Sequence, residues 1–233
     1  MKKLTAYVYI DGLNLFYGCL KGSIYKWLDI NKLISFYFPK YELLKIKYFS
    51  AITKPRANDL LKPIRQLTYF RALNTLPNLE IILGTFLENE TMAYVPEKSN
   101  FWGHQKVRVS FNGDKLKLPL SGRNYLIVKK TEEKGSDVNL ATHLIVDAYE
   151  KRFDVAIVVS NDSDLVGPIK AINGKNKVFI RLLSPYRKVN RELLEAVKGN
   201  IKIIRKGALL SFQFDRSLED KNGSFHMPER WLF

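Results

Sequence analysis

The sequence predicts an α/β fold in which a parallel β-sheet is covered by helices on both faces. Two observations lead to this prediction. Apolar runs typical of strands alternate along the chain with segments whose apolar residues have helical spacing. The chain of 233 residues is also 46% hydrophobic and 12% aromatic, which is enough for a sizeable core in one domain, or in a domain with an appendage.

The first third of the chain supplies three predicted strands and two predicted helices. Ala6–Ile10 is a short apolar run typical of a buried strand, and a helical stretch begins shortly after it. Ile46–Ile52 is a second β-rich run. Asn58–Leu76 has apolar residues at helical spacing and predicts a long helix. Leu79–Leu83 predicts a third strand, which we expect to end at Gly84.

The second half of the chain continues the alternation. Asp137–Tyr149 places its apolar residues on one face of a helix, and Val155–Val159 is the most apolar strand in the chain. Asp164–Ile172 predicts a helix that ends at an Asn-Gly pair. The remaining predicted elements are a strand, a helix and a strand at Val178–Leu183, Arg191–Val197 and Ile201–Ile204. This alternation favours parallel strands joined by right-handed crossovers.

One region interrupts this rhythm. Asn89–Lys130 has the alternation of β-strands on both sides of Asn112-Gly113, which is a strong hairpin signal. The stretch from Lys98 to Lys130 carries eight Lys or Arg residues and one acid, Asp114. We therefore predict a basic β-hairpin inserted between the third strand and the helix that begins at Asp137.

The end of the chain has a different character. After Gly207 come four apolar residues, a polar stretch and then Trp231, which predicts an arm that packs back on the domain. We expect residues 1–206 to form the main domain, with the inserted hairpin at about 89–130. Residues 207–233 would form the C-terminal arm.

Charge and composition restrict the classes of function. The 38 Lys and Arg residues outnumber the 23 Asp and Glu residues, and the resulting net charge of +15 favours a nucleic-acid partner over a membrane. Cys19 is the single cysteine, which excludes an internal disulfide and a cysteine metal cluster. We find no signal peptide and no apolar segment long enough to span a membrane, so we expect a cytoplasmic protein.

Acidic residues follow two of the predicted strands and begin one helix. Asp11 ends the first strand, while Asp162 and Asp164 follow the Val155 strand; Asp137 begins the helix that leads into it. If the two strands are neighbours, these carboxylates converge at the carboxyl edge of the sheet, where sites form in doubly wound folds. Each acid taken alone could instead cap a helix or form a turn.

Converging carboxylates repel one another unless a cation lies between them, and oxygen ligands suit Mg²⁺ or Mn²⁺. A metal held in this way can activate water for phosphodiester hydrolysis. Two nearby groups are expected to lie outside the site. Asp147 lies about 15 Å along the helix from Asp137 and reads as a surface or helix-end acid, and His143 reads as structural.

Three segments that carry these acids resemble the NYN domain of the PIN-like nuclease superfamily. They are YVYIDGLNLFYG (Tyr7–Gly18), KTEEKGSDVNLATHLIVDAY (Lys130–Tyr149) and VVSNDSDLVGPIK (Val158–Lys170). The resemblance continues through Arg65–Leu73 and the MPERW sequence near the C-terminus. It implies a Rossmann-like, PIN-like sheet and a Mg²⁺- or Mn²⁺-dependent ribonuclease. His143 stands where many relatives have a further acid.

The resemblance also implies roles for individual residues. Asp11 and Asp162 would be direct metal ligands, and Asp137 and Asp164 would complete the shell or orient the attacking water. The residues expected to support the site or bind substrate are Asn14, Ser160, Asn161, Lys134 and Arg65.

Two functions remain open at this point. The first is an endoribonuclease that prefers single-stranded RNA, and the second is a non-catalytic RNA-binding or regulatory adaptor with the same fold. A homodimer is compatible with both. A phosphatase with an aspartyl nucleophile is less favoured, because the position two residues after Asp11 is Leu13 and not an acid.

Overall fold

The computed structural model describes residues 3–55, 58–94, 125–175 and 178–232. In these residues the strands are β1 (Leu4–Asp11), β2 (Tyr41–Ala51), β3 (Leu79–Tyr94), β4 (Tyr125–Lys134), β5 (Val155–Val159), β6 (Phe179–Ser184), β7 (Ile201–Ile203), β8 (Ser217–Asp220) and β9 (Gly223–His226). The helices are α1 (Gly12–Leu15), α2 (Ile30–Tyr37), α3 (Lys62–Leu73), α4 (Ser136–Tyr149), α5 (Val166–Lys175), α6 (Arg191–Ala196) and α7 (Lys206–Ser211). A π-helical turn (Phe16–Leu20) follows α1, and short 3₁₀ turns lie at Ser163–Leu165 and Glu229–Trp231.

The predicted fold class is confirmed. The central sheet has seven strands in the order β4-β3-β2-β1-β5-β6-β7, and every neighbouring pair except β3 and β4 is parallel. The strand order reverses at β1, because β2 pairs with one of its edges and β5 with the other. In a sheet of this kind, the gap beside that reversal is the usual place for a site.

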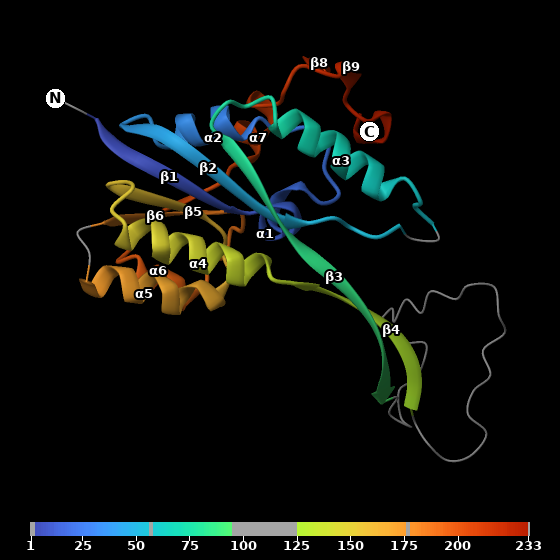
Figure 1. The fold of residues 1–233 in the computed structure, drawn as a ribbon, viewed down its shortest axis with the longest axis horizontal. Coiled ribbons are helices and arrows are strands. Elements are labelled where there is room, and N and C mark those ends of the chain that lie inside the picture. Colours follow the sequence, from blue (N-terminus) through green and yellow to red (C-terminus); the bar gives the residue numbers. More distant parts are fainter. Residues whose placement is uncertain (1–2, 56–57, 95–124, 176–177, 233) are drawn as a thin grey trace.

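Helices cover both faces of the sheet and bury two apolar cores (Figure 1). Successive residues of a strand point to opposite faces. Accordingly, Val8 and Ile10 of β1 pack in the core that includes α2 and α3, while Tyr9 packs in the core that includes α4, α5 and α6. All five residues of β5 are buried, as expected for a central parallel strand.

β3 continues beyond the expected end at Gly84, so that prediction is wrong. Gly84 is the last residue of β3 that pairs with β2, and Thr85 begins an antiparallel ladder with β4 that reaches Tyr94 opposite Tyr125. A β-carbon on Gly84 would lie 2.6 Å from the carbonyl oxygen of Lys134. The glycine therefore marks a change of partner strand, where the incoming backbone of β4 comes close.

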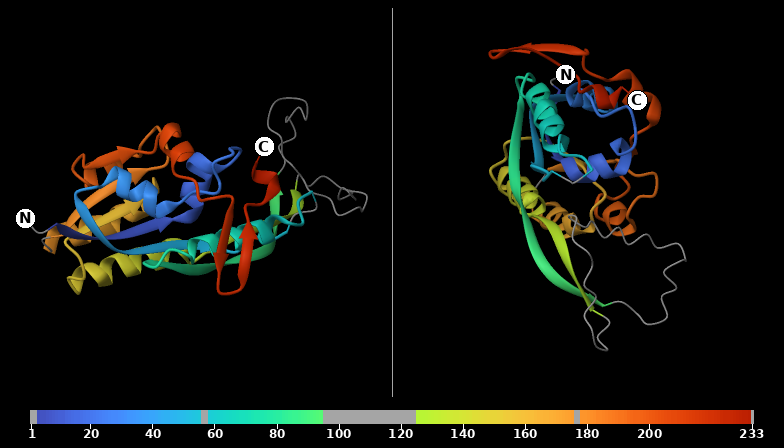
Figure 2. Two further views of the ribbon diagram at one scale, coloured as in Figure 1. Left: turned by 90° about the horizontal axis from the view of Figure 1, so that it is seen from above. Right: turned by 90° about the vertical axis from the view of Figure 1, so that its right-hand side faces the viewer.

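β3 and β4 together form a twisted ribbon that leaves the body of the domain (Figures 1 and 2). The ribbon connects the sheet to the inserted region, whose predicted turn at Asn112-Gly113 lies outside the described residues. At the other end, β4 leads through Gly135 into α4. Gly135 has a φ of 94°, a left-handed conformation that a residue with a β-carbon adopts only at a cost.

The C-terminal residues pack on the face of the sheet that carries α2 and α3. The ring of Trp27 contacts the rings of Phe214, Phe225 and Trp231, and its indole N–H donates to the backbone oxygen of Asp215 at 2.7 Å. The β8–β9 hairpin lies across α3 (Figure 2), where Arg71 of α3 makes an ion pair of 2.6 Å with Asp220. This hairpin and α2 are elements that the apolar pattern did not predict.

Within the part of the chain that the structure describes, no helix combines the length and the apolar character that crossing a lipid bilayer requires.

Candidate metal centre

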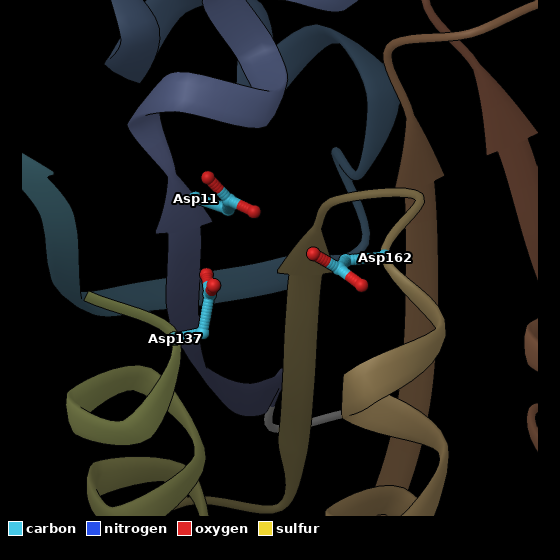
Figure 3. A group of neighbouring side chains, drawn as sticks. All are labelled: Asp11, Asp137 and Asp162. Atoms are coloured by element: carbon cyan, nitrogen blue, oxygen red, sulfur yellow. The ribbon is translucent and has the colours of Figure 1, made fainter. Parts of the chain in front are cut away.

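Three aspartates from separate elements meet at the carboxyl edge of the sheet, beside the point where the strand order reverses (Figure 3). Asp11 ends β1, Asp162 follows β5, and Asp137 lies in the first turn of α4. Each offers one carboxylate oxygen, and these three oxygens lie within 4.8 Å of one another. The parallel pairing of Ile10 with Val159 brings the ends of β1 and β5 to the same level and so produces this approach.

The carboxylate of Asp11 is held in place by two hydrogen bonds. Its Oδ1 accepts from the backbone N–H of Asn14 at 2.8 Å, and its Oδ2 accepts from the hydroxyl of Ser160 at 3.1 Å. The same hydroxyl oxygen accepts from the backbone N–H of Asp162 at 3.1 Å. Ser160 is completely buried, and the two hydrogen bonds of its hydroxyl link Asp11 to the backbone of Asp162.

Asp164 stands apart from these three. Asp162 caps the 3₁₀ turn, with its Oδ1 accepting from the backbone N–H of Asp164 at 3.1 Å. The side chain of Asp164 is exposed, and it is not one of the three that offer oxygens to a common point. Its negative charge nevertheless contributes to the electrostatics of Asp137.

The two asparagines near the site act on its framework. Asn14 accepts from the backbone N–H of Asn161 at 2.9 Å, which joins α1 to the loop after β5. The side chain of Asn161 accepts from the backbone N–H of Asn190 at 2.8 Å and donates to the backbone oxygen of Lys188 at 3.2 Å. Asn161 therefore fastens the loop before α6 to the loop that carries Asp162.

The two predicted basic residues occupy different places. Lys134 is exposed at the end of β4, opposite Thr85 and three residues before Asp137. Arg65 lies on α3, where its Nη2 donates to both carboxylate oxygens of Asp59 at 2.5 and 2.6 Å. Lys134 is thus the last residue of the strand that leads into the site, whereas Arg65 belongs to a separate ion pair on α3.

The aspartates strongly influence one another. Burial is the main cause that raises the pKa of Asp11 to about 7; the negative charges of Asp137 and Asp162 also raise it, while the hydrogen bonds from Asn14 and Ser160 lower it. Burial also raises the pKa of Asp137 to about 6, together with the charges of Asp162, Glu133 and Asp164. Both shifts mean that negative charge at this edge is unfavourable without a compensating cation.

Glu133 is a contributor that the sequence reasoning missed. Its Oε1 accepts from the backbone N–H of Ser136 at 2.9 Å, at the start of α4, and its charge acts on Asp137. The signal was present in the acidic pair that comes shortly before Asp137 in the sequence. Glu133 therefore adds negative charge near Asp137 and contributes to its raised pKa.

The arrangement fits a hard divalent cation. Three converging carboxylates are the oxygen ligands that Mg²⁺ and Mn²⁺ prefer, and a bound cation would offset the repulsion that raises the pKa of Asp11 and Asp137. Asp11, Asp137 and Asp162 are the residues that could hold it.

Asp147 lies near the end of α4, as one of the two predicted alternatives had it, but it is buried, so the alternative of a surface acid is wrong. Its side chain is 1% exposed and lies within 2.5 Å of the Lys47 ammonium from β2. It also accepts from the hydroxyl of Tyr9 at 2.7 Å and from Arg152 at 2.8 Å. His143 lies beside the same lysine, with its Nδ1 3.1 Å from the Lys47 nitrogen. These contacts join β1, β2 and α4, which are far from one another in sequence, so a local sequence pattern does not predict them.

Comparisons with known proteins agree with this fold. The family model of the NYN domain matches residues 88–204. A Pseudomonas putida protein named 6-hydroxy-3-succinoylpyridine 3-monooxygenase HspA is 29% identical, over 98% of this chain and 75% of that protein. A crystal structure of a protein of unknown function from Vibrio parahaemolyticus superposes with a TM-score of 0.52 at 17% identity, covering 92% of this chain and all of that one.

The model match spans half of the chain and includes Asp137, Asp162 and Asp164, so the protein belongs to the NYN domain family within the PIN-like superfamily.

Proposed function

We propose that this NYN-family protein is a metal-dependent endoribonuclease that hydrolyses phosphodiester bonds in single-stranded RNA. The observation that carries the proposal is the meeting of Asp11, Asp137 and Asp162 within 4.8 Å at the reversal of strand order. Membership of a nuclease family is consistent with a hydrolase.

In this proposal the three aspartates would hold Mg²⁺ or Mn²⁺, which would supply an activated water and stabilise negative charge on the phosphate. Ser160 and Asn14 keep the Asp11 carboxylate in one orientation through their hydrogen bonds. Asp164 is exposed on the 3₁₀ turn that Asp162 caps, and in this proposal it would orient the attacking water. Lys134 is exposed at the end of β4 and would bind the phosphate backbone of the RNA.

The net charge of +15 supports an anionic polymer as substrate. A basic surface attracts RNA from a distance, while the acidic edge holds the metal at which the backbone is cut. We expect binding to weaken steeply with added salt, because each phosphate contact releases counterions. A cytoplasmic location suits an RNA substrate of this kind.

The Pseudomonas relative is named for the oxidation of a pyridine. Two proteins of one fold can catalyse different reactions when their sites differ, and this relative is 29% identical. The aspartates of this chain, not that name, are therefore the basis of the proposal.

The proposal is tested with the full-length protein and labelled single-stranded RNA, in the presence of Mn²⁺, Mg²⁺ or EDTA. Asp11→Asn and the double variant Asp11→Asn/Asp162→Asn should lower the cleavage rate by roughly 100-fold or more, because direct metal ligands are lost. Asp215→Asn, which changes an exposed aspartate outside the group of three, is the matched control and should cleave normally.

The outcomes separate the two functions. Cleavage that requires both the metal and the aspartates supports the nuclease. Tight RNA binding without cleavage favours the regulatory adaptor. Cleavage at an unchanged rate by the Asp11→Asn variant would end the mechanism proposed here.

A further inference from the structure

A pocket lies on the face of the sheet that carries α3, next to α1 and the C-terminal 3₁₀ turn. Its volume is about 230 Å³. Aromatic side chains from distant parts of the chain form much of its wall: Phe16, Tyr48, Tyr69, Phe70 and Trp231. For comparison, an apolar cavity of ~150 Å³ can hold benzene. The hollow, which we call the α3 pocket, therefore has room for one aromatic ring and one substituent.

The charged residues around the α3 pocket are mostly cationic. Lys26, Lys62, Arg65 and Arg230 line it, and Asp59 is the acid among the lining residues. Both arginines share the Asp59 carboxylate, at 2.5 Å for Arg65 and 2.9 Å for Arg230. One carboxylate balances only one of these two guanidinium charges, so positive charge is left in excess.

The crowding of cations is visible at Lys26. Burial lowers its pKa, and the positive charges of Arg65 and Arg230 lower it further. Its ammonium donates to the backbone oxygen of Ser23. An anion in the α3 pocket would relieve this repulsion, as a metal would relieve the opposite repulsion among the aspartates.

The α3 pocket also contains an unused polar group. The hydroxyl oxygen of Thr53, a lining residue, is buried and has no hydrogen-bond partner among the residues that the structure describes. The neighbouring Gln66 cannot serve it readily, because its side chain already accepts from the Thr53 N–H at 2.7 Å and donates to the Ala51 oxygen at 2.9 Å. A buried hydroxyl without a partner is costly and is most readily explained by a ligand or water.

We propose that the α3 pocket binds one planar aromatic ring that carries an anionic group. The ring would lie against Tyr48, Phe70 and Trp231, and the anion would face Arg65 and Arg230. Rings pack well against aromatic walls, and guanidinium groups bind carboxylate and phosphate in pairs of hydrogen bonds. The ligand is either a nucleotide or a small aromatic carboxylic acid, which share this chemistry.

This site is distinct from the candidate metal centre and does not depend on the proposed nuclease. Gly12 and Leu13 line the α3 pocket and directly follow Asp11, whereas none of the three aspartates lines it. The two sites are thus neighbours along the chain, on different residues. A ligand in the α3 pocket would contact the start of α1, whose Asn14 N–H holds Asp11.

The test is isothermal titration of the full-length protein with four probes: uridine 5′-monophosphate, 4-hydroxybenzoate, uridine and inorganic phosphate. We expect at least one of the first two to bind at least 10-fold more tightly than uridine or phosphate. Preference between the nucleotide and the carboxylate identifies the source of the ligand. Absence of binding by both, or phosphate binding as tightly as either, would overturn the proposal.

Variants locate the binding. Arg230→Gln should weaken the preferred probe at least 5-fold, and Thr53→Val should weaken it without lowering the melting temperature. Arg191→Gln changes an arginine that is 90% exposed on α6 and should have no effect. Asp11→Asn should retain binding, which separates this proposal from the nuclease. Unchanged affinity in both Arg230→Gln and Thr53→Val would place the ligand elsewhere and refute the α3 pocket.

Discussion

Helix α4 carries one aspartate near each end, and the two have opposite surroundings. Asp137, in the first turn, faces the carboxylates of Asp11 and Asp162. Asp147, near the last turn, faces the cations of Lys47 and Arg152. The pKa of Asp137 is raised to about 6 by burial and by acidic neighbours. Burial also opposes ionisation of Asp147, but its hydrogen bonds from Lys47 and Tyr9 and the nearby cations bring its pKa below the usual value.

The difference shows how one chain treats buried negative charge in two ways. At Asp147 the fold itself supplies the balancing cation, so the charge belongs to the structure. At the candidate metal centre an ion from solution would supply the balance. A buried ion pair is therefore expected to respond to mutation through stability, and the aspartate group through metal binding.

The largest effect is expected from Lys47→Met. This change leaves the Asp147 carboxylate buried beside Tyr9 with only the half-exposed Arg152 as a cation, and should lower the free energy of unfolding by about 3–5 kcal/mol. Chemical denaturation measures the loss. The double variant Lys47→Met/Asp147→Leu should recover much of it, because no unpaired charge remains. A single variant as stable as the wild type would contradict the comparison.

A smaller effect is expected when the metal-facing side is changed. At a Mn²⁺ concentration ~100-fold above the dissociation constant, wild-type protein should gain about 2.7 kcal/mol of stability. Asp11→Asn should lose most of this gain, while its metal-free form should be more stable than wild type by about 1–2 kcal/mol at pH 8, because a repelled buried charge is removed. Thermal unfolding with and without Mn²⁺ measures both quantities.

Equal stabilisation of Asp11→Asn and wild type by Mn²⁺ would mean that Asp11 is not a ligand. Asp215→Asn should retain the full metal-dependent gain and serves as the control.

pH should separate the two aspartate environments. Metal ligands must be deprotonated, so lowering the pH from 8 to 6, through the pKa of Asp11, should weaken Mn²⁺ binding by about 10-fold. In the metal-free protein, by contrast, the free energy of unfolding that Asp11 contributes decreases as the pH rises. A raised folded-state pKa gives Asp11 a stabilising contribution that is complete below its unfolded pKa and is lost as the pH rises through about 7.

Asp147 has the reverse sign, because its pKa is lowered in the folded state. Its contribution is present above the unfolded value of 3.8 and is lost as the pH falls through the folded value. Denaturation of Asp11→Asn and Asp147→Asn between pH 3 and 8 should therefore show their differences from wild type in separate pH ranges. Coincident ranges would argue against the assigned surroundings.

The smallest effect is expected from Arg152→Gln. The Arg152 side chain is 47% exposed, and Lys47 remains beside Asp147 when it is removed. A partly solvated ion pair contributes little, so the loss should be about 0.5–1 kcal/mol. If denaturation shows a loss as large as that of Lys47→Met, then Lys47 is not the main partner of Asp147.

The local pattern of the sequence was sufficient for the alternation of strands and helices and for the parallel sheet. It also predicted the edge that gathers Asp11, Asp137 and Asp162, because carboxyl ends of neighbouring parallel strands share an edge. Asp164 was predicted to join them, but it does not belong to the group whose oxygens converge. The roles of these aspartates in catalysis remain a prediction.

What the pattern missed has three different causes. Asp147 was predicted to be a surface or helix-end acid from its distance to Asp137, and its partners Lys47 and Tyr9 are far from it in sequence. Arg65 was grouped with the site, but the short-range partner Asp59 holds it on α3. Helix α2 was a different kind of omission: Asp29 caps it, and its apolar residues Ile30, Leu33, Ile34 and Tyr37 have the right spacing.

The ribbon of β3 and β4 has a consequence for protein engineering. Ten residue pairs, from Thr85 opposite Lys134 to Tyr94 opposite Tyr125, separate the inserted segment from Gly135 and Asp137. A one-residue slip in this ladder would turn every following side chain to the other face. An exchange of residues 95–124 that keeps this register, for a two-residue Asn-Gly turn or for a foreign sequence, should therefore leave the position of Asp137 unchanged. The ribbon is thus a natural grafting point, at which new recognition sequences can be joined to an unchanged acidic edge.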